Sequence, residues 1–231
     1  MITEKEITGL ITTDRLTNYI RSLEPERGEL LERIRKEALA EEVPIIRDET
    51  AALLKCLISA VRPKTILEIG TAVGYSALTM AAASDPDARI LTIENYEPRI
   101  EKARQNIGKS LYADRIELWT GDAGPILEKL RDEGRQFDLI FMDAAKGQYP
   151  VWLPDIRMLL RVHGMLISDN ILQDGSIADS RFLIERRDRT IHSRLREYLF
   201  TLKHTPELET AVLTVGDGVA VSVKKRETGE A

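Results

Sequence analysis

Between residues 65 and 170 the chain alternates five times between a short β-rich run and a segment whose apolar residues recur at helical spacing. This alternation predicts a doubly wound α/β fold, in which helices join parallel strands and cover both faces of the sheet. Two further β-rich runs flank Gly216-Asp217-Gly218, which predicts a closing hairpin and one antiparallel C-terminal strand. The predicted strands span 65–70, 89–94, 115–121, 137–143, 164–170, 209–216 and 219–225.

The N-terminal part has a different pattern. Residues 13–40 are charged with helical periodicity, interrupted by the stretch EPERGE, and predict two helices. Residues 48–61 predict a third helix, which the breaker Arg-Pro-Lys closes. The 231 residues suit a single domain with a large core. We therefore expect one domain over 1–231, with an N-terminal helical part (1–60) and an α/β core (61–231).

Composition excludes several classes of protein. No apolar run approaches the length of a membrane span, and the N-terminus lacks the basic start and apolar block of a secretory signal. We therefore expect a cytoplasmic protein without a membrane partner. The single cysteine, Cys56, cannot form an internal disulfide and is expected in the core. Three scattered histidines exclude a zinc site of clustered Cys and His. A net charge of −5 disfavours indiscriminate nucleic-acid binding but allows a local basic face.

Ligands of open α/β sheets bind beyond the C-terminal ends of the strands, so the residues at these ends are the candidates for a site. After the first strand, Gly70 and Gly74 form G-x-x-x-G and not the G-x-G-x-x-G of dinucleotide-binding redox enzymes. The second strand ends at Glu94, whose carboxylate can accept hydrogen bonds from both hydroxyls of a ribose. Alone, either feature is an ordinary turn or a solvated acid. Together they predict an adenosine-containing cofactor.

The third strand is followed by Asp122 and Ala123. The Asp122 carboxylate could pair with an adenine amino group, and the Ala123 amide with a ring nitrogen. Asp122 also precedes a predicted helix that has no better N-cap residue. The pattern alone leaves both interpretations open.

The fourth strand ends at Asp143 and the fifth at Asp169-Asn170. If these strands are neighbours, two carboxylates lie side by side and repel each other unless a cation lies between them. Two carboxylates, an amide oxygen and water form the oxygen-only ligand set that suits Mg²⁺ or another hard divalent cation. The alternative is a helix cap beside an Asx-turn. The amide of Asn170 directly beside the second acid favours the metal.

Taken together, EIGTAVGYS, IE, GDA, MDAAKGQY and SDN resemble the class I S-adenosylmethionine-dependent O-methyltransferases of the catechol and caffeoyl-CoA type, over about residues 40–225. The resemblance implies a Rossmann-like sheet of seven strands with the last strand antiparallel. It implies that Asp143, Asp169 and Asn170 bind the metal. It also implies a wall for S-adenosylmethionine formed by Ile46, Glu68, Gly70, Ser76, Glu94, Asp122, Ala123 and Asp143. Position 46 is often methionine in this family, so Ile46 keeps the apolar wall but loses a sulfur contact.

Three residues after Asp143, Lys146 is placed to take a proton from an acceptor hydroxyl. A lysine would need its pKa depressed, by metal charge or burial, to do so. The alternatives are a solvent-exposed loop lysine, or activation by the metal alone. Tyr149 is expected mainly to pack in the core.

The motifs VPII, DNILQDG and TAVLTVGDGVAVSVKK also resemble the bacterial tRNA 5-hydroxyuridine methyltransferases. This implies a tRNA anticodon loop as partner and wobble 5-methoxyuridine as product. A helix predicted over about 182–204 belongs to a segment with six arginines that could hold anticodon phosphates: Arg181, Arg186, Arg187, Arg189, Arg194 and Arg196. The alternatives are a solvated helix face and methylation of a small catechol-like compound. A homodimer is also expected, with the N-terminal helices at its interface.

Overall fold

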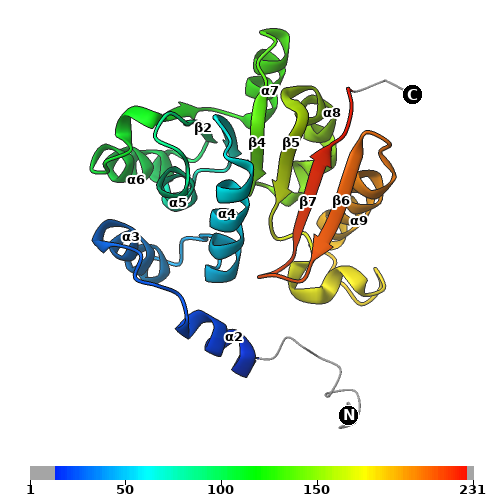
Figure 1. Ribbon diagram of the computed structural model, residues 1–231. Coiled ribbons are helices and arrows are strands. Elements are labelled where there is room, and N and C mark those ends of the chain that lie inside the picture. The colour runs from blue at the N-terminus through cyan, green and yellow to red at the C-terminus, as the bar shows by residue number, and fades with distance from the viewer. Residues whose placement is uncertain (1–13, 228–231) are drawn as a thin grey trace.

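The computed structural model describes residues 14–227 and contains one mixed sheet of seven strands in the order β3-β2-β1-β4-β5-β7-β6. All neighbours pair in parallel except β7, which is antiparallel to both β5 and β6 (Figure 1). The predicted seven-stranded fold with an antiparallel last strand is therefore confirmed. The strands are β1 Thr65–Ile69, β2 Arg89–Glu94, β3 Ile116–Thr120, β4 Phe137–Met142, β5 Leu160–Ser168, β6 Leu208–Leu213 and β7 Val219–Lys224.

Helices cover both faces of the sheet. α4 Asp48–Val61 and α5 Tyr75–Ala83 lie on one face, and α8 Tyr149–Leu159 and α9 Arg189–His204 on the other (Figure 1). The remaining α-helices are α2 Asp14–Ser22, α3 Glu29–Ala40, α6 Glu97–Gly108 and α7 Ala123–Asp132. Short 3₁₀ segments span Ala113–Arg115 and Lys146–Gln148, and Gln173–Ala178 is broken by a kink at Asp174 and Gly175. None of the helices within residues 14–227 is both long and apolar enough to cross a lipid bilayer.

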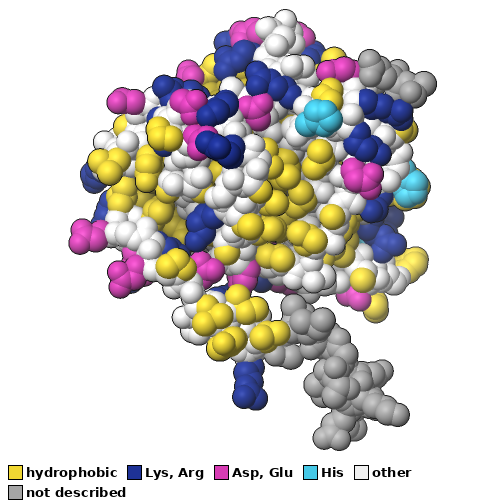
Figure 2. Space-filling view, in the orientation of Figure 1, with side chains coloured by type: hydrophobic (Ala, Val, Ile, Leu, Met, Phe, Trp, Pro, Cys, Tyr) yellow, Lys and Arg dark blue, Asp and Glu magenta, His cyan; other side chains and the backbone are white. Residues whose placement is uncertain are grey.

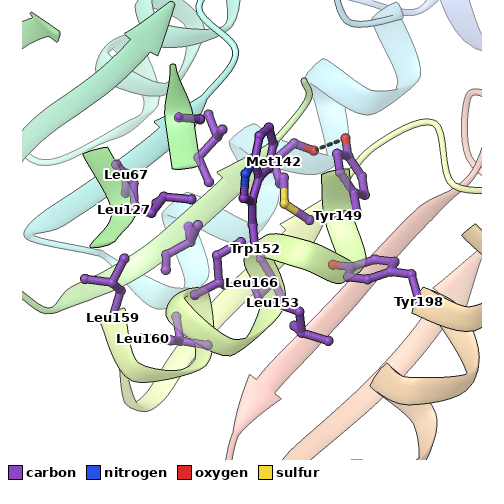
Figure 3. Packing of buried hydrophobic residues seen from close by; sticks show 14 of the residues in the cluster. Leu67, Leu127, Met142, Tyr149, Trp152, Leu153, Leu159, Leu160, Leu166 and Tyr198 are labelled. Carbon is purple, nitrogen blue, oxygen red and sulfur yellow. Dashed lines mark hydrogen bonds between the residues drawn. The ribbon is translucent and has the colours of Figure 1, made fainter. Parts of the chain in front are cut away.

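The core forms two apolar layers, because successive strand residues point to opposite faces of the sheet. In β4, Ile140 and Met142 join the layer under α7, α8 and α9, whereas Leu139 and Phe141 join the layer under α3 to α6. Figure 3 shows part of the first layer, in which Trp152 of α8 packs among the strand residues. Full burial of each such side chain stabilises the fold by roughly 1.5–3 kcal/mol. The two layers hold the strand ends, and thus the site, in fixed register.

Four local predictions were wrong. β6 ends at Leu213 and not at 216. β5 begins at Leu160 and not at 164, because it starts directly after α8 and absorbs an irregularity where His163 has a φ of 66°. α9 begins at Arg189 and not near 182, because its buried stripe starts only at His192 and continues through Leu195, Tyr198 and Leu202. Cys56 is exposed, because the buried stripe of α4 runs through other positions, including Leu54 and Ile58.

Exposed apolar side chains gather on α2. Tyr19, Ile20 and Leu23, at and just beyond its C-terminal end, are 60%, 44% and 63% exposed. Figure 2 shows hydrophobic side chains covering the visible side of this helix. Contiguous exposed apolar surface is a feature of interaction sites rather than of ordinary solvated helices.

Candidate functional site

A cavity of about 850 Å³ opens at the C-terminal ends of the central strands. The loops that follow β1, β2, β3, β4 and β5 each contribute to its wall. Seven of the residues predicted for the site line it: Gly70, Glu94, Asp122, Ala123, Asp143, Lys146 and Asn170. The topology thus brings together residues that lie up to 100 positions apart in the sequence.

The turn after β1 lies against the end of β4. Gly70 has a φ of 103°, and a Cβ at this position would lie 2.3 Å from the carbonyl oxygen of Asp143. Only glycine combines this backbone conformation with so close an approach. The amide of Asp143 donates to the carbonyl of Ile69 at 3.0 Å, which fixes the two segments together.

Glu94 is held by backbone amides. Its Oε2 accepts from the Ala72 amide at 2.8 Å, and its Oε1 accepts from the amides of Asn95 and Tyr96 at 3.0 and 3.1 Å. These donors orient a carboxylate that is only 6% exposed yet reaches the cavity. A carboxylate has about four acceptor positions, so beside these three amides Glu94 keeps about one for a ribose hydroxyl.

Asp122 caps α7, as one of its two interpretations predicted. Its Oδ1 accepts from the Gly124 amide at 3.0 Å. Asp122 and Ala123 also line the cavity, so capping and ligand contact are compatible here. The cap presents the second carboxylate oxygen and the Ala123 amide from a fixed helix N-terminus.

Three residues predicted to contact the cofactor do not line the cavity: Ile46, Glu68 and Ser76. Ile46 is buried in the core, while its neighbours Ile45 and Arg47 reach the cavity. Glu68 is fully buried within β1, where its Oε2 accepts a hydrogen bond from the Thr92 hydroxyl. Burial raises the pKa of Glu68 to about 7, and the hydroxyls of Ser76 and Thr92 act against this shift. These residues lie behind the wall rather than in it.

The two acids predicted as metal ligands lie on neighbouring strands. The Asp169 amide donates to the Met142 carbonyl at 3.0 Å, in continuation of the β4–β5 pairing. Asp169 is 1% exposed, and within residues 14–227 its Oδ1 has no hydrogen-bond partner. Burial, followed by the charge of Asp143, raises the pKa of Asp169 to about 7. Asn170 adopts a left-handed φ of 57° and reaches the cavity.

This arrangement fits a divalent cation. A buried carboxylate oxygen without a partner is costly, and a cation would satisfy it while screening Asp143 from Asp169. Asp143, Asp169 and Asn170 supply only oxygen ligands, which hard cations prefer. Within the described residues, no group of three His, Cys, Asp or Glu side chains could hold a metal ion. The proposed ligand set therefore needs the amide oxygen of Asn170 beside the two carboxylates.

Lys146 contacts Asp143 rather than facing solvent alone. Its Nζ lies 2.6 Å from Asp143 Oδ1 and 3.2 Å from the Tyr149 hydroxyl, and its side chain is 20% exposed. Tyr149 is fully buried and donates to the Met142 carbonyl at 2.9 Å, as Figure 3 shows. Its ring packs edge-on against Tyr198. The structure thus places Tyr149 in the core, where its hydroxyl also fixes Lys146.

With this geometry in place, comparison with known proteins identifies the family. The model of a family described as O-methyltransferase matches residues 21–225. The chain belongs to the O-methyltransferase family. Caffeoyl-CoA O-methyltransferase of Eucalyptus gunnii is 30% identical over 220 residues, covering 92% of this chain and 88% of the relative. Catechol O-methyltransferase of Niastella koreensis is 35% identical over 128 residues, covering 54% of this chain and 58% of the relative.

A solved structure supports the same assignment. The O-methyltransferase of Bacillus cereus, determined in complex with SAH, has a TM-score of 0.80 and 26% identity, covering 91% of this chain and 97% of that one. SAH is the demethylated product of S-adenosylmethionine. The resemblance of the sequence motifs to this class of O-methyltransferases is therefore confirmed at the level of the family.

The six arginines of the arginine-rich segment do not line the cavity, and several of their donors bind within the protein. Arg194 donates to the Gly147 carbonyl at 2.8 Å, which ties α9 to the loop that carries Lys146. Arg196 and Arg189 also donate to backbone carbonyls, and Arg187 pairs with Glu185. Arg181 and Arg186 are exposed.

Arg47 was not predicted as a residue of the site. This arginine lines the cavity at the N-cap position of α4, and its guanidinium pairs with Asp174 and Asp217. Its one sequence signal is a charged residue placed between the VPII motif and a predicted helix. Both acid partners are more than 120 residues away along the chain, so the pairing depends on the tertiary fold.

Proposed function

We propose that this O-methyltransferase transfers a methyl group from S-adenosylmethionine to an acceptor hydroxyl in a reaction that depends on a divalent cation, with Mg²⁺ as the expected ion. The observation that carries the metal proposal is the buried Oδ1 of Asp169, which has no hydrogen-bond partner within the described residues and lies beside Asp143. Asp143, Asp169 and Asn170 would hold the ion. The SAH complex of the Bacillus cereus relative supports the choice of cofactor.

When bound, the cofactor supplies an electrophilic methyl group and the cation polarises the acceptor hydroxyl. The protein's own contribution is positional, because in-line displacement needs the acceptor oxygen, methyl carbon and sulfur held collinear. Glu94 and Asp122, each fixed by backbone amides, orient the adenosine part of the cofactor. The turn at Gly70 packs against the backbone of Asp143, so the loop after β1 and the proposed metal ligand lie side by side.

Lys146 has two possible roles at this site. Its ammonium group, 2.6 Å from Asp143, has no lone pair and cannot accept a proton in that state. It therefore acts as the catalytic base only after it loses a proton and releases Asp143. In the arrangement described here Lys146 holds Asp143. A bound cation would lower the pKa of an acidic acceptor hydroxyl, and its proton would pass to water. An unchanged pH–rate profile in Lys146→Ala would exclude the role of base.

The metal proposal is tested by removing the cation and its ligand separately. Exhaustive treatment with EDTA followed by metal-free dialysis should abolish methyl transfer, and Mg²⁺ should restore it. Asp169→Asn should reduce kcat by at least 100-fold while the Kd for S-adenosylmethionine changes less than threefold, because Asp169 is proposed to bind the metal and is not among the residues expected to contact the cofactor. Full activity of the metal-free protein would contradict the proposal.

For the acceptor, we propose 5-hydroxyuridine at the wobble position of a tRNA anticodon loop. The contact of Arg194 with Gly147 supports this proposal, because it sets the arginine-rich segment against the loop that carries Lys146. The exposed Arg181 and Arg186 can contact phosphates, and a base in a single-stranded loop can splay into a cavity without breaking pairs. Binding through phosphates should weaken as salt rises.

A small catechol-like acceptor is the second candidate. It is favoured by the printed names of the relatives, caffeoyl-CoA and catechol O-methyltransferase. The two candidates are separated by incubating the protein with labelled S-adenosylmethionine, Mg²⁺ and either hydroxyuridine-containing tRNA or catechol. Label in the tRNA supports the first candidate. Label in catechol with none in the tRNA would replace it by the second.

We also propose that the protein forms a homodimer through its N-terminal helices. The exposed apolar side chains of Tyr19, Ile20 and Leu23 support this proposal, since a second copy of the chain would remove them from water.

A further inference from the structure

Arg47 lies between two cavities and has no role in the methyl transfer proposed above. A second cavity, of about 1100 Å³, lies between α2, α4, the loop after β5 and the β6–β7 turn. Of the residues between 14 and 227, Arg47 and Asp217 alone line both this cavity and the one at the strand ends. The guanidinium therefore lies where the two cavities meet.

The two acid partners of Arg47 hold it very unequally. Asp217 lies 3.1 Å from Nε with a side chain only 17% exposed, whereas Asp174 lies 2.8 Å from Nη2 and is 68% exposed. An ion pair with so exposed a carboxylate contributes little, because water and salt screen it. Asp174 accepts a hydrogen bond from Nη2 but is exposed, so another anion can replace it. Asp217 is the less exposed partner and attracts the guanidinium by charge, since its Oδ1 has no hydrogen-bond partner among the described residues.

The loop that carries Asp174 is directly connected to the reacting centre. Asn170, four residues earlier, lines the first cavity, and Ile171 and Leu172 donate through their amides to the β6–β7 turn at 3.0 Å. Asn170, Gln173 and Asp174 all adopt left-handed backbone conformations, which non-glycine residues rarely do. These strained residues belong to a loop that the ion pair between Arg47 and Asp174 connects to α4.

We propose that Arg47 determines acceptor specificity by binding an anionic group of the acceptor, a phosphate or a carboxylate, in place of Asp174. A guanidinium presents parallel N–H donors that match the paired oxygens of such groups. With Asp217 on Nε, the Nη donors that now contact Asp174 are the ones that turn to the acceptor. This inference rests on the proposed methyl transfer but is independent of whether the acceptor is RNA or a small molecule.

The experiment compares acceptors that differ in charge. One arm uses 3,4-dihydroxybenzoate against catechol, and the other uses 5-hydroxyuridine 5′-monophosphate against the 5-hydroxyuridine nucleoside. Dissociation constants are measured by calorimetry with SAH and Mg²⁺ present, and KM and kcat are measured where turnover occurs. The quantity of interest is the ratio of the constants for the anionic and the neutral member of each pair.

In the wild type we expect the anionic member of one pair to bind at least tenfold more tightly than the neutral member. A preference in the first arm indicates a carboxylate on the acceptor, and a preference in the second indicates a phosphate. Arg47→Gln should remove this preference, and Arg47→Lys, which keeps the charge but not the fork, should restore part of it. Asp174→Asn should increase the preference, because it releases the guanidinium from its competitor. Asparagine also tolerates the left-handed backbone at position 174.

A purely structural role predicts a different pattern. If Arg47 only tied the loop to α4, Arg47→Gln and Asp174→Asn would break the same contact and shift both acceptors in the same direction. Arg62→Gln, at the opposite end of α4, is the matched control and should leave the ratio unchanged. Parallel shifts in the two variants, or no anionic preference in the wild type in either arm, would overturn the proposal. Absence of methyl transfer with the binding preference intact would instead contradict the proposed function alone.

Discussion

At the scale of single residues, Glu68 gives the fold a pH dependence. Burial raises its pKa from the usual 4.5 to about 7. Between these values the folded protein keeps a proton that the unfolded chain has released, so the free energy of unfolding falls as pH rises through this window. The loss amounts to about 3 kcal/mol and persists at higher pH. Glu68→Gln, which cannot ionise, should therefore gain stability relative to the wild type between pH 4.5 and 8. Denaturant unfolding of both proteins at the two pH values measures the gain, and an equal difference at both would show that Glu68 does not titrate in this range.

The residues of the site were predictable where a strand end placed them and unpredictable where packing decided. Gly70, Glu94, Asp122 and Asp143 lie at or within two residues of strand ends, so the doubly wound pattern alone places them at one edge of the sheet. For Glu68, a residue inside a strand, the sequence does not show whether the side chain reaches the ligand or stays behind the wall. Arg47 could not be found, because its partners Asp174 and Asp217 come from loops that meet only in three dimensions.

At the scale of elements, Lys224 at the end of β7 secures the end of α8. Lys224 is only 1% exposed, and its Nζ donates to the carbonyls of Arg157 and Leu160 at 2.9 and 2.8 Å. Arg157 lies in the last turn of α8, and Leu160 begins β5 directly after it, so the ammonium group joins both elements to β7. Lys224→Met should lower the free energy of unfolding by about 2–4 kcal/mol, because it removes two hydrogen bonds that a buried charged donor makes. Lys225→Met is the control. Lys225 pairs with Glu209 at the surface, and its loss should cost less than about 0.5 kcal/mol in the same denaturant titration. Equal losses in the two variants would contradict this role of Lys224.

The prediction of α9 shows why element boundaries were harder to predict than the elements. Charged residues around 182–188 have adequate helix propensity, but Phe182 and Leu183 are 87% and 77% exposed and bury nothing. Helices in proteins are stabilised mainly by packing of an amphipathic face, and that face begins only at His192. The arginine-rich segment is therefore part turn and part helix, a division that composition does not reveal.

At the scale of the whole molecule, the order of the strands follows from chain connections that the sequence already displays. Five strand–helix alternations predict the parallel part, and Gly216-Asp217-Gly218 predicts the final hairpin. The position of β7 between β5 and β6 was harder to predict from the sequence. It requires that β7 match the β5 edge, where Val221 and Val223 pair with Ile167 and Met165. Such pairing is a property of the assembled sheet rather than of either segment.

Assembly of the whole molecule into a homodimer is tested through α2. Leu23→Glu combined with Tyr19→Glu places two charges on the exposed apolar surface of this helix, where burial against a second copy would cost several kcal/mol. In sedimentation velocity we expect the wild type to migrate as a dimer and the double variant as a monomer with an unchanged circular dichroism spectrum. Leu111→Glu is the matched control, because Leu111 is 97% exposed in a loop far from α2 in the sequence, and this variant should remain a dimer. A monomeric wild type, or a double variant that still dimerises, would remove α2 from the interface and leave its apolar surface to another partner.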